Sequence, residues 1–151
     1  MWLNNILETI GNTPLIRLNK ITENIPATIL AKVDYFNPGN SIKDRMALKM
    51  VEVAEADGRL KTGGTIIECT SGNTGMGLAL AAIVKGYKCI FTTTEKQSKE
   101  KIDTLELLGA DLHLVPATSY SDKNHYIHQA ERLTNKLAQR EEHGAIWARQ
   151  F

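Results

Sequence analysis

From residue 65 onward, short apolar segments of strand length alternate with segments of helical length, and this alternation restricts the fold more than any other feature. We expect strands at 65–69, 88–93 and 111–115, and a short apolar run at 145–148. The helices expected between them cover about 76–84, 98–108 and 122–137. Strands that alternate with helices form a parallel sheet, because each right-handed crossover must bury the apolar face of its helix on the sheet. We therefore predict an α/β fold with an open parallel sheet covered by helices.

The first part of the chain has a different pattern. Two strand-like segments, 15–18 and 28–36, flank a polar break and predict a hairpin-like pair. Helical spacing then begins at Ser41, which can serve as the N-cap, and Gly58 can end the helix. The apolar face expected for this helix consists of Ile42, Met46, Ala47, Met50, Val53 and Ala54. The pattern therefore predicts that Lys43 lies in the first turn of a helix.

Composition excludes several classes of function. The 151 residues, 42% hydrophobic and 23% charged, predict one globular domain. With 18 basic and 17 acidic residues, the chain has no excess charge that favours nucleic acid or an anionic membrane as a partner. Cys69 and Cys89 lie in apolar runs, which predicts buried free thiols and no metal site. No secretory signal or segment of transmembrane length is present in the sequence, so we expect a cytoplasmic protein.

A polar glycine-containing loop, residues 70–75, connects the strand at 65–69 to an apolar helix. In open parallel sheets, ligands bind where such loops lead into helix N-termini. The backbone N–H groups and neutral side chains of this loop suit a carboxylate or a phosphate, although an isolated loop of this kind can also be a plain connection with an N-cap. Its glycines run in the reverse order to the dinucleotide fingerprint, and no P-loop lysine follows, which disfavours a nucleotide-binding module.

Lys43 is the second candidate for chemistry. Most lysines are solvated surface charges, but a cation near a helix N-terminus is disfavoured by roughly 0.3 to 1 kcal/mol. This field favours the neutral amine, the form that condenses with an aldehyde. We expect the neighbouring Asp44 and Arg45 to have structural roles, either pairing with each other or capping elements.

Three motifs, in this order, resemble those of the cysteine synthase and cystathionine β-synthase family of pyridoxal phosphate enzymes, which have the type II fold. They are GNTPL at 11–15, NPGNSIKDR at 37–45 and ECTSGNTG at 68–75. The resemblance continues through LELLGA at 105–110 to Gln150 and Phe151, and thus covers nearly the whole chain. The stretch TEKQSKEK at 94–101 looks slightly more like the cystathionine synthase branch.

The resemblance implies a role for each residue that matches a motif. Lys43 would bind pyridoxal 5'-phosphate through its aldehyde and then act as the base that removes the substrate's α-proton. Asn73 would hydrogen-bond the ring hydroxyl oxygen of the cofactor. The substrate carboxylate would be bound by loop residues and by a glutamine near the end of the chain, namely Thr70, Ser71, Gly72, Thr74 and Gln150.

The implied reaction is β-replacement on a serine-type amino acid. Serine or O-acetylserine would react with homocysteine or sulfide to give cystathionine or cysteine, which makes the chain a lyase or transferase by family. Two alternatives use the same residues: a non-catalytic truncated or split fragment, and an amino acid deaminase of the same fold. The TSGNTG form of the loop favours β-replacement over the deaminase.

The resemblance also implies a division of the chain. Residues 1–36 would be a strand pair that belongs to a larger domain, and residues 37–151 would be a smaller αβ domain. The family's glycine-rich phosphate loop has no counterpart downstream of Asn73, so we expect an N-terminal half without the domain that binds the cofactor phosphate. Its possible partners are a second copy or a complementary C-terminal half. We expect the following strand residues to be partly uncovered: Leu15, Ile16, Leu18, Ile29 and Leu30.

Overall fold

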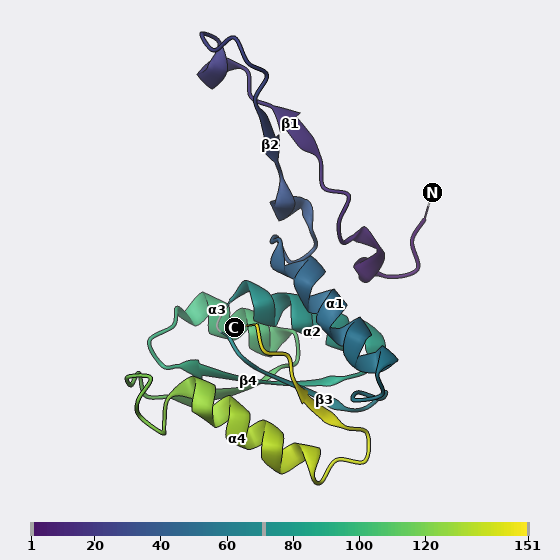
Figure 1. Ribbon diagram of the computed structural model, residues 1–151, viewed down its shortest axis with the longest axis vertical. Helices are drawn as coiled ribbons and strands as arrows, with labels where there is room; N and C mark the ends of the chain where they lie inside the picture. Colours follow the sequence, from purple (N-terminus) through teal and green to yellow (C-terminus); the bar gives the residue numbers. More distant parts are fainter. Residues whose placement is uncertain (1, 71, 151) are drawn as a thin grey trace.

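The computed structural model describes residues 2–70 and 72–150 (Figure 1). Its main sheet has four strands, β3 (Thr65–Cys69), β4 (Lys88–Thr94), β5 (Asp111–Val115) and β6 (Ala145–Trp147). All neighbours pair in parallel, in the order β5-β4-β3-β6. The predicted α/β fold with a parallel sheet is thus confirmed, and the predicted strands differ from the observed ones by at most one residue.

Helices cover both faces of the sheet (Figure 1). One face carries α1 (Lys43–Ala56), α2 (Asn73–Lys85) and α3 (Lys99–Leu107), and the other carries α4 (Tyr126–Ala138). Successive side chains of a strand point to opposite faces, so Ile66 packs with the first group of helices and Ile67 with α4. This two-sided burial explains why β3 is buried along its whole length.

The buried face of α1 differs from the prediction. Of the predicted face, Ala47 and Ala54 are buried, whereas Ile42 and Val53 are exposed; Val51, which was not predicted, is buried instead. The reason is close contact with α2, since a Cβ atom on Gly77 would lie 2.8 Å from Cβ of Ala47. The small residues of this contact rotate α1 away from the orientation that its larger apolar side chains predict.

Helix boundaries were predicted best where a cap is evident in the sequence. Ser41 accepts the N–H of Lys43 on its Oγ, at 3.0 Å, but the N-cap of α1 is Ile42, one residue later than predicted. Helix α2 ends where Gly86 adopts a φ of 77°. By contrast, α4 begins at Tyr126 and not at residue 122, because His125 supplies the cap by accepting the N–H of Ile127. In the described part of the chain, no helix has the length and apolar character needed to span a membrane.

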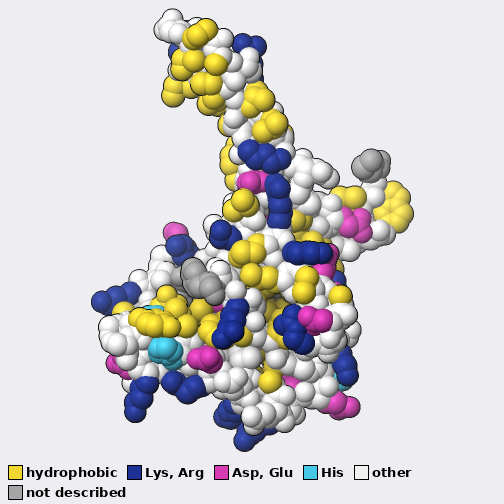
Figure 2. Space-filling model, viewed as in Figure 1, with side chains coloured by type: hydrophobic (Ala, Val, Ile, Leu, Met, Phe, Trp, Pro, Cys, Tyr) yellow, Lys and Arg dark blue, Asp and Glu magenta, His cyan; other side chains and the backbone are white. Residues whose placement is uncertain are grey.

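The N-terminal strands form a separate antiparallel pair, β1 (Leu15–Arg17) and β2 (Leu30–Lys32), in an arm that extends away from the main sheet (Figure 1). Short 3-10 helices accompany them: η1 (Ile6–Thr9), η2 (Lys20–Thr22) and η3 (Asp34–Phe36). The strand expected at 28–36 is shorter than predicted because the chain turns into η3. Leu15 is 60% exposed and Leu30 50%, so the expected incomplete covering is confirmed for the arm, along which Figure 2 shows hydrophobic side chains.

Candidate functional site

A cavity of about 290 Å³ lies at the carboxyl ends of β3 and β4, beside the N-terminus of α2. This is the position at which open parallel sheets bind ligands, because helix N-termini and strand-end loops meet there. Its lining comes from distant parts of the sequence: Lys43, Cys69, Thr70, Gly72, Asn73, Thr74, Thr93, Thr94, Gln97, Tyr126 and Gln150.

The fold brings the site residues predicted from the sequence into one place. Lys43, Asn73 and Gln150 all line the cavity, and so do the loop residues Thr70, Gly72 and Thr74. Ser71 and Phe151 lie outside the described residues. The chemical roles assigned to these residues stay predictions, while their proximity is a property of the structure.

A buried turn holds Lys43 at the start of α1. The side chain of Asn37 donates to the carbonyls of Asp34 and Ser41 and accepts the N–H of Gly11. Asp44, which is fully buried, accepts the N–H of Gly39 at 2.5 Å. Burial raises the pKa of the Asp44 carboxyl, and the bond from Gly39 opposes that shift. A side chain on Gly39 would collide with this carboxylate, so glycine is required here.

Of the two structural roles expected for Asp44 and Arg45, pairing with each other does not occur. Arg45 instead forms an ion pair with Asp34 and donates to the hydroxyl of Thr13. Adjacent residues of a helix point in different directions, which prevents the two side chains from meeting. The hydrogen bond from Thr13 lowers the pKa of Asp34, and Arg45 adds to this effect. Asp44 and Arg45 therefore both have structural roles, as expected. Through Asp34 and Thr13, Arg45 connects α1 to the base of the arm.

The loop after β3 is ordered by its own hydroxyl groups and by Gln150. Oγ1 of Thr70 accepts the N–H of Gly75 at 3.2 Å, which fixes the entry to α2. Thr74 donates from Oγ1 to Oε1 of Gln150 at 2.5 Å. Nε2 of Gln150 donates in turn to the carbonyl of Cys69 at 3.1 Å. The side-chain amide of Gln150 thus joins the end of β3 to the first turn of α2.

Five lining residues were not predicted: Thr93, Thr94, Gln97, Tyr126 and Cys69. The first two end β4, the parallel neighbour of β3, and the carboxyl ends of neighbouring parallel strands lie at the same edge of a sheet. That signal was available in the sequence. Tyr126 is held nearby because Thr92 donates from Oγ1 to its carbonyl at 2.8 Å.

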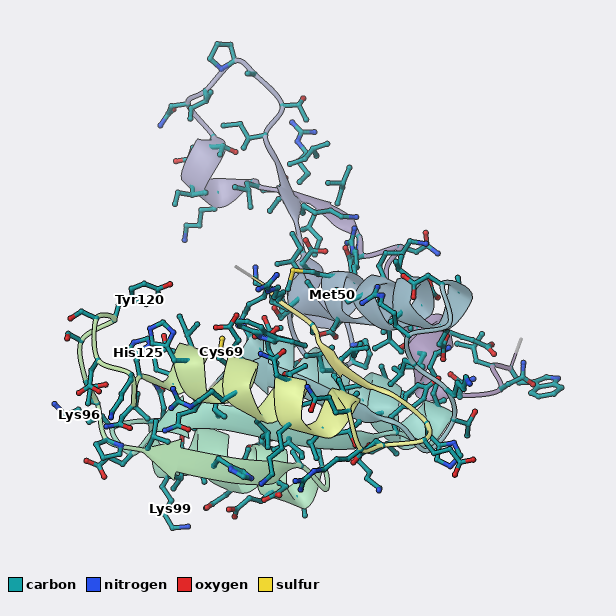
Figure 3. The ribbon with its side chains drawn as sticks, turned by 60° about the horizontal axis from the view of Figure 1, so that its bottom comes forward. Met50, Cys69, Lys96, Lys99, Tyr120 and His125 are labelled. Carbon is teal, nitrogen blue, oxygen red and sulfur yellow. The ribbon has the colours of Figure 1, made fainter. Side chains whose placement is uncertain are left out.

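The thiol of Cys69 lies beside this site without the properties of a nucleophile. Figure 3 shows Cys69 near the start of α4, where His125 is also labelled. Burial, followed by the charge of Glu68, raises the pKa of Cys69 to about 12. Burial alone raises the pKa of Cys89 to about 12. Both residues are therefore neutral thiols near pH 7, as the apolar runs predicted.

Comparisons with known proteins identify what the chain is similar to. The sequence pattern of the family described as pyridoxal-phosphate dependent enzyme matches residues 6–151. Cysteine synthase 1 of Emericella nidulans is 46% identical over 150 residues, which cover 99% of this chain and 39% of that protein. Cystathionine beta-synthase of Mus musculus is 51% identical over 138 residues, which cover 89% of this chain and 25% of that protein.

Solved structures give the same result. A hydrogen sulfide-producing enzyme from Fusobacterium nucleatum superposes with a TM-score of 0.83 at 34% identity, covering 99% of this chain and 46% of that one. O-ureido-L-serine synthase superposes with a TM-score of 0.81 at 37% identity, covering 100% and 45%. The chain therefore spans less than half the length of each of these relatives.

Proposed function

Since this chain belongs to the pyridoxal-phosphate dependent enzyme family, we propose that its cavity is the lysine-bearing half of an active site for β-replacement on a serine-type amino acid. One observation carries the proposal. Lys43 lines the same cavity as Asn73, Thr74 and Gln150, although these residues come from three separate parts of the sequence.

The residues of the cavity fit the cofactor in two respects. An aldehyde requires a primary amine, and Lys43 supplies one; a ring hydroxyl requires a hydrogen-bonding partner, and the amide of Asn73 supplies one. Lys43 carries the only formal charge among the described lining residues. We therefore assign the contact with the cofactor phosphate to the part of such enzymes that lies outside the matched region.

The role proposed for each cavity residue follows from the chemistry of its side chain. When bound, pyridoxal phosphate supplies an electron sink that stabilises the carbanion left at the substrate's α-carbon. Lys43 Nζ takes the α-proton, and Asn73 orients the ring by a hydrogen bond. The substrate carboxylate is bound by the N–H groups at the start of α2, together with Thr70, Gly72, Thr74 and Gln150. Ser71 belongs to the same proposed set.

The substrates proposed are serine or O-acetylserine with homocysteine or sulfide, which give cystathionine or cysteine. The names of the relatives support both reactions, at similar identity. A second candidate, a non-catalytic fragment, uses the same residues; the 151 residues span 39% of cysteine synthase 1 and 25% of cystathionine beta-synthase. We accordingly expect the 151-residue chain alone to bind the cofactor weakly and to turn over little substrate.

Covalent trapping tests the proposal without requiring turnover. The chain is incubated with pyridoxal phosphate, reduced with borohydride, digested and mapped by mass spectrometry. We expect the label on Lys43 at the lowest cofactor concentrations, and we expect it to disappear in Lys43→Ala. Lys49→Ala, which removes an exposed lysine of the same helix, should leave the Lys43 label unchanged. Labelling spread equally over surface lysines in the wild-type chain would refute the proposed role of Lys43.

A further inference from the structure

Glu68 is a carboxylate in the middle of the core, on the central strand β3, with 0% of its surface exposed. Its Oε1 accepts the N–H of Cys69 at 2.7 Å and the indole N–H of Trp147 at 3.2 Å. The thiol of Cys69 also lies 3.2 Å from Oε1. Its Oε2 accepts the backbone N–H of Gln150 at 3.1 Å. Both carboxylate oxygens therefore accept hydrogen bonds.

Glu68, like Asp44, is a carboxylate with 0% of its surface exposed. In the part of the chain that the structure describes, its carboxylate forms no ion pair with a lysine, arginine or histidine. A buried carboxylate is costly unless hydrogen bonds satisfy it, and here neutral N–H groups do so. Two of these donors, Trp147 and Gln150, come from β6 and the residues that follow it.

The bond to Gln150 bears directly on the cavity. Glu68 fixes the backbone of Gln150, while Thr74 and the carbonyl of Cys69 hold its side-chain amide. Among the described residues, Nε2 of Gln150 donates one hydrogen bond, to the carbonyl of Cys69, and its second hydrogen has no acceptor. Gln150 also lines the cavity. A ligand carboxylate can accept that hydrogen only if Gln150 stays in the wall of the cavity, where Glu68 holds its backbone.

We propose that Glu68 is a positioning residue, which holds Gln150 in the carboxylate-binding wall of the cavity without touching the ligand. The identity of that ligand, an amino acid carboxylate, rests on the function proposed above; the positioning itself does not. A simpler role would be to fasten β6 to β3 through Trp147, with no consequence for binding. In the positioning role, the hydrogen bond from Gln150 to Glu68 affects ligand binding; in the simpler role, neither that bond nor the bond from Trp147 does.

Glu68→Gln separates them, because the variant keeps the size of the side chain. An amide retains one acceptor oxygen and turns an NH₂ group toward the donors of Gln150 or Trp147. The matched control is Trp147→Phe, which removes the indole donor and leaves the contact between Glu68 and Gln150. Folding of each variant is checked by far-UV circular dichroism. If Glu68→Gln does not fold, Glu68→Asp keeps the charge and withdraws the carboxylate by one methylene.

Two measurements on the 151-residue chain decide the matter. The first is the ¹⁵N NMR signal of the Gln150 side-chain amide without ligand. In Glu68→Gln we expect the chemical shift and mobility of this amide to approach those of a free glutamine. In Trp147→Phe we expect both to stay unchanged. The second is titration with L-serine, followed by chemical-shift changes. We expect the Kd to rise roughly three- to tenfold in Glu68→Gln, as for the loss of one hydrogen bond, and less than twofold in Trp147→Phe.

A double-mutant cycle with Gln150→Ala tests whether Glu68 acts through Gln150. If it does, the double variant binds L-serine no more weakly than Gln150→Ala alone. Additive losses, or equal losses in Glu68→Gln and Trp147→Phe, would overturn the positioning role. If the wild-type chain binds no L-serine, the proposed ligand is wrong, but an unchanged Gln150 signal in Glu68→Gln would still overturn the positioning role on its own.

Discussion

Thr74 and Gln150 are 76 residues apart in the sequence, and the hydroxyl of Thr74 donates a hydrogen bond of 2.5 Å to the side-chain oxygen of Gln150. This bond connects the first turn of α2 to the residues after β6 across the wall of the cavity. A carboxylate that enters the cavity would compete with Gln150 for the Thr74 hydroxyl, because a hydroxyl donates a single hydrogen.

Thr74→Val should therefore lower both stability and affinity. The variant keeps the shape of the side chain but removes the donor, and we expect a loss of about 1 kcal/mol in the free energy of unfolding, measured by urea denaturation. L-serine binding should weaken in the same variant. Thr74→Ser retains the hydroxyl and serves as the control. If both variants bind L-serine equally, the Thr74 hydroxyl has no part in carboxylate binding.

Gly77 sets the distance between α1 and α2. Replacing glycine by alanine inside a helix normally stabilises by up to about 1 kcal/mol. At Gly77 the added Cβ would lie 2.8 Å from Cβ of Ala47 and 3.2 Å from the carbonyl oxygen of Lys43. We therefore expect Gly77→Ala to destabilise the chain by about 1 to 3 kcal/mol in thermal or urea unfolding.

The same variant should displace Lys43, because the clash includes its backbone. Trapping of pyridoxal phosphate on Lys43 should then fall. Ile83→Ala is the control on the same helix, since Ile83 is 56% exposed and its loss should change stability by less than about 0.5 kcal/mol. A neutral or stabilising effect of Gly77→Ala would show that the two helices can separate without cost.

The strands of the main sheet and the place of the cavity could be predicted because they depend on local patterns, whereas the strand order was not predicted. β-branched runs such as residues 65–67 and glycine stops such as Gly86 act over a few residues, and a parallel sheet follows from their alternation. The face of α1 could not be predicted in this way. It depends on how closely α2 approaches, and that approach is decided by Gly77, which lies 30 residues away from Ala47 in the sequence.

Some polar contacts of the site could be predicted from neighbouring residues, and others depend on the whole fold. The contact of Ser41 with the start of α1 could be predicted from its position alone, since such a contact acts on the next two or three residues, although the N-cap itself is Ile42. The ion pair of Arg45 with Asp34 and the hydrogen bonds of Glu68 with Gln150 join residues whose separation in space depends on the whole fold. In the sequence, Glu68 begins the motif at 68–75, but nothing nearby indicates its contact with Gln150.

Acid should weaken a contact between α1 and the end of α2. Burial of Glu55 opposes its ionisation, but hydrogen bonds from Lys85 and Tyr87 outweigh that effect and lower its pKa below 4.5. A lowered pKa stabilises the folded state above the unfolded value, and this contribution is lost as the pH falls through the folded pKa. Glu55→Gln should therefore show a flatter decline in unfolding free energy below about pH 4.5 than the wild-type chain.

Glu52→Gln is the matched control, since Glu52 lies one turn away on α1 and forms an ion pair with the exposed Lys49. Its stability should follow the wild-type curve between pH 3 and pH 6, values chosen to bracket an ordinary glutamate pKa of about 4.3. If Glu55→Gln and Glu52→Gln give the same pH dependence, the contact of Glu55 with Lys85 and Tyr87 does not contribute to acid stability.

Both cysteines should resist alkylation in the folded chain. Thiolates are the reactive form, and burial raises the pKa of Cys69 and of Cys89 to about 12. Iodoacetamide at neutral pH should therefore label neither residue quickly until urea unfolds the chain, as followed by mass spectrometry. Cys89→Ser allows the rate to be assigned to Cys69 alone.

Because the charge of Glu68 contributes to the raised pKa of Cys69, folded Glu68→Gln should be labelled faster at Cys69 than the wild-type chain. An unchanged rate in that variant would mean that burial by itself protects the thiol, while rapid labelling of the folded wild-type chain would mean that the end of β3 opens into the cavity.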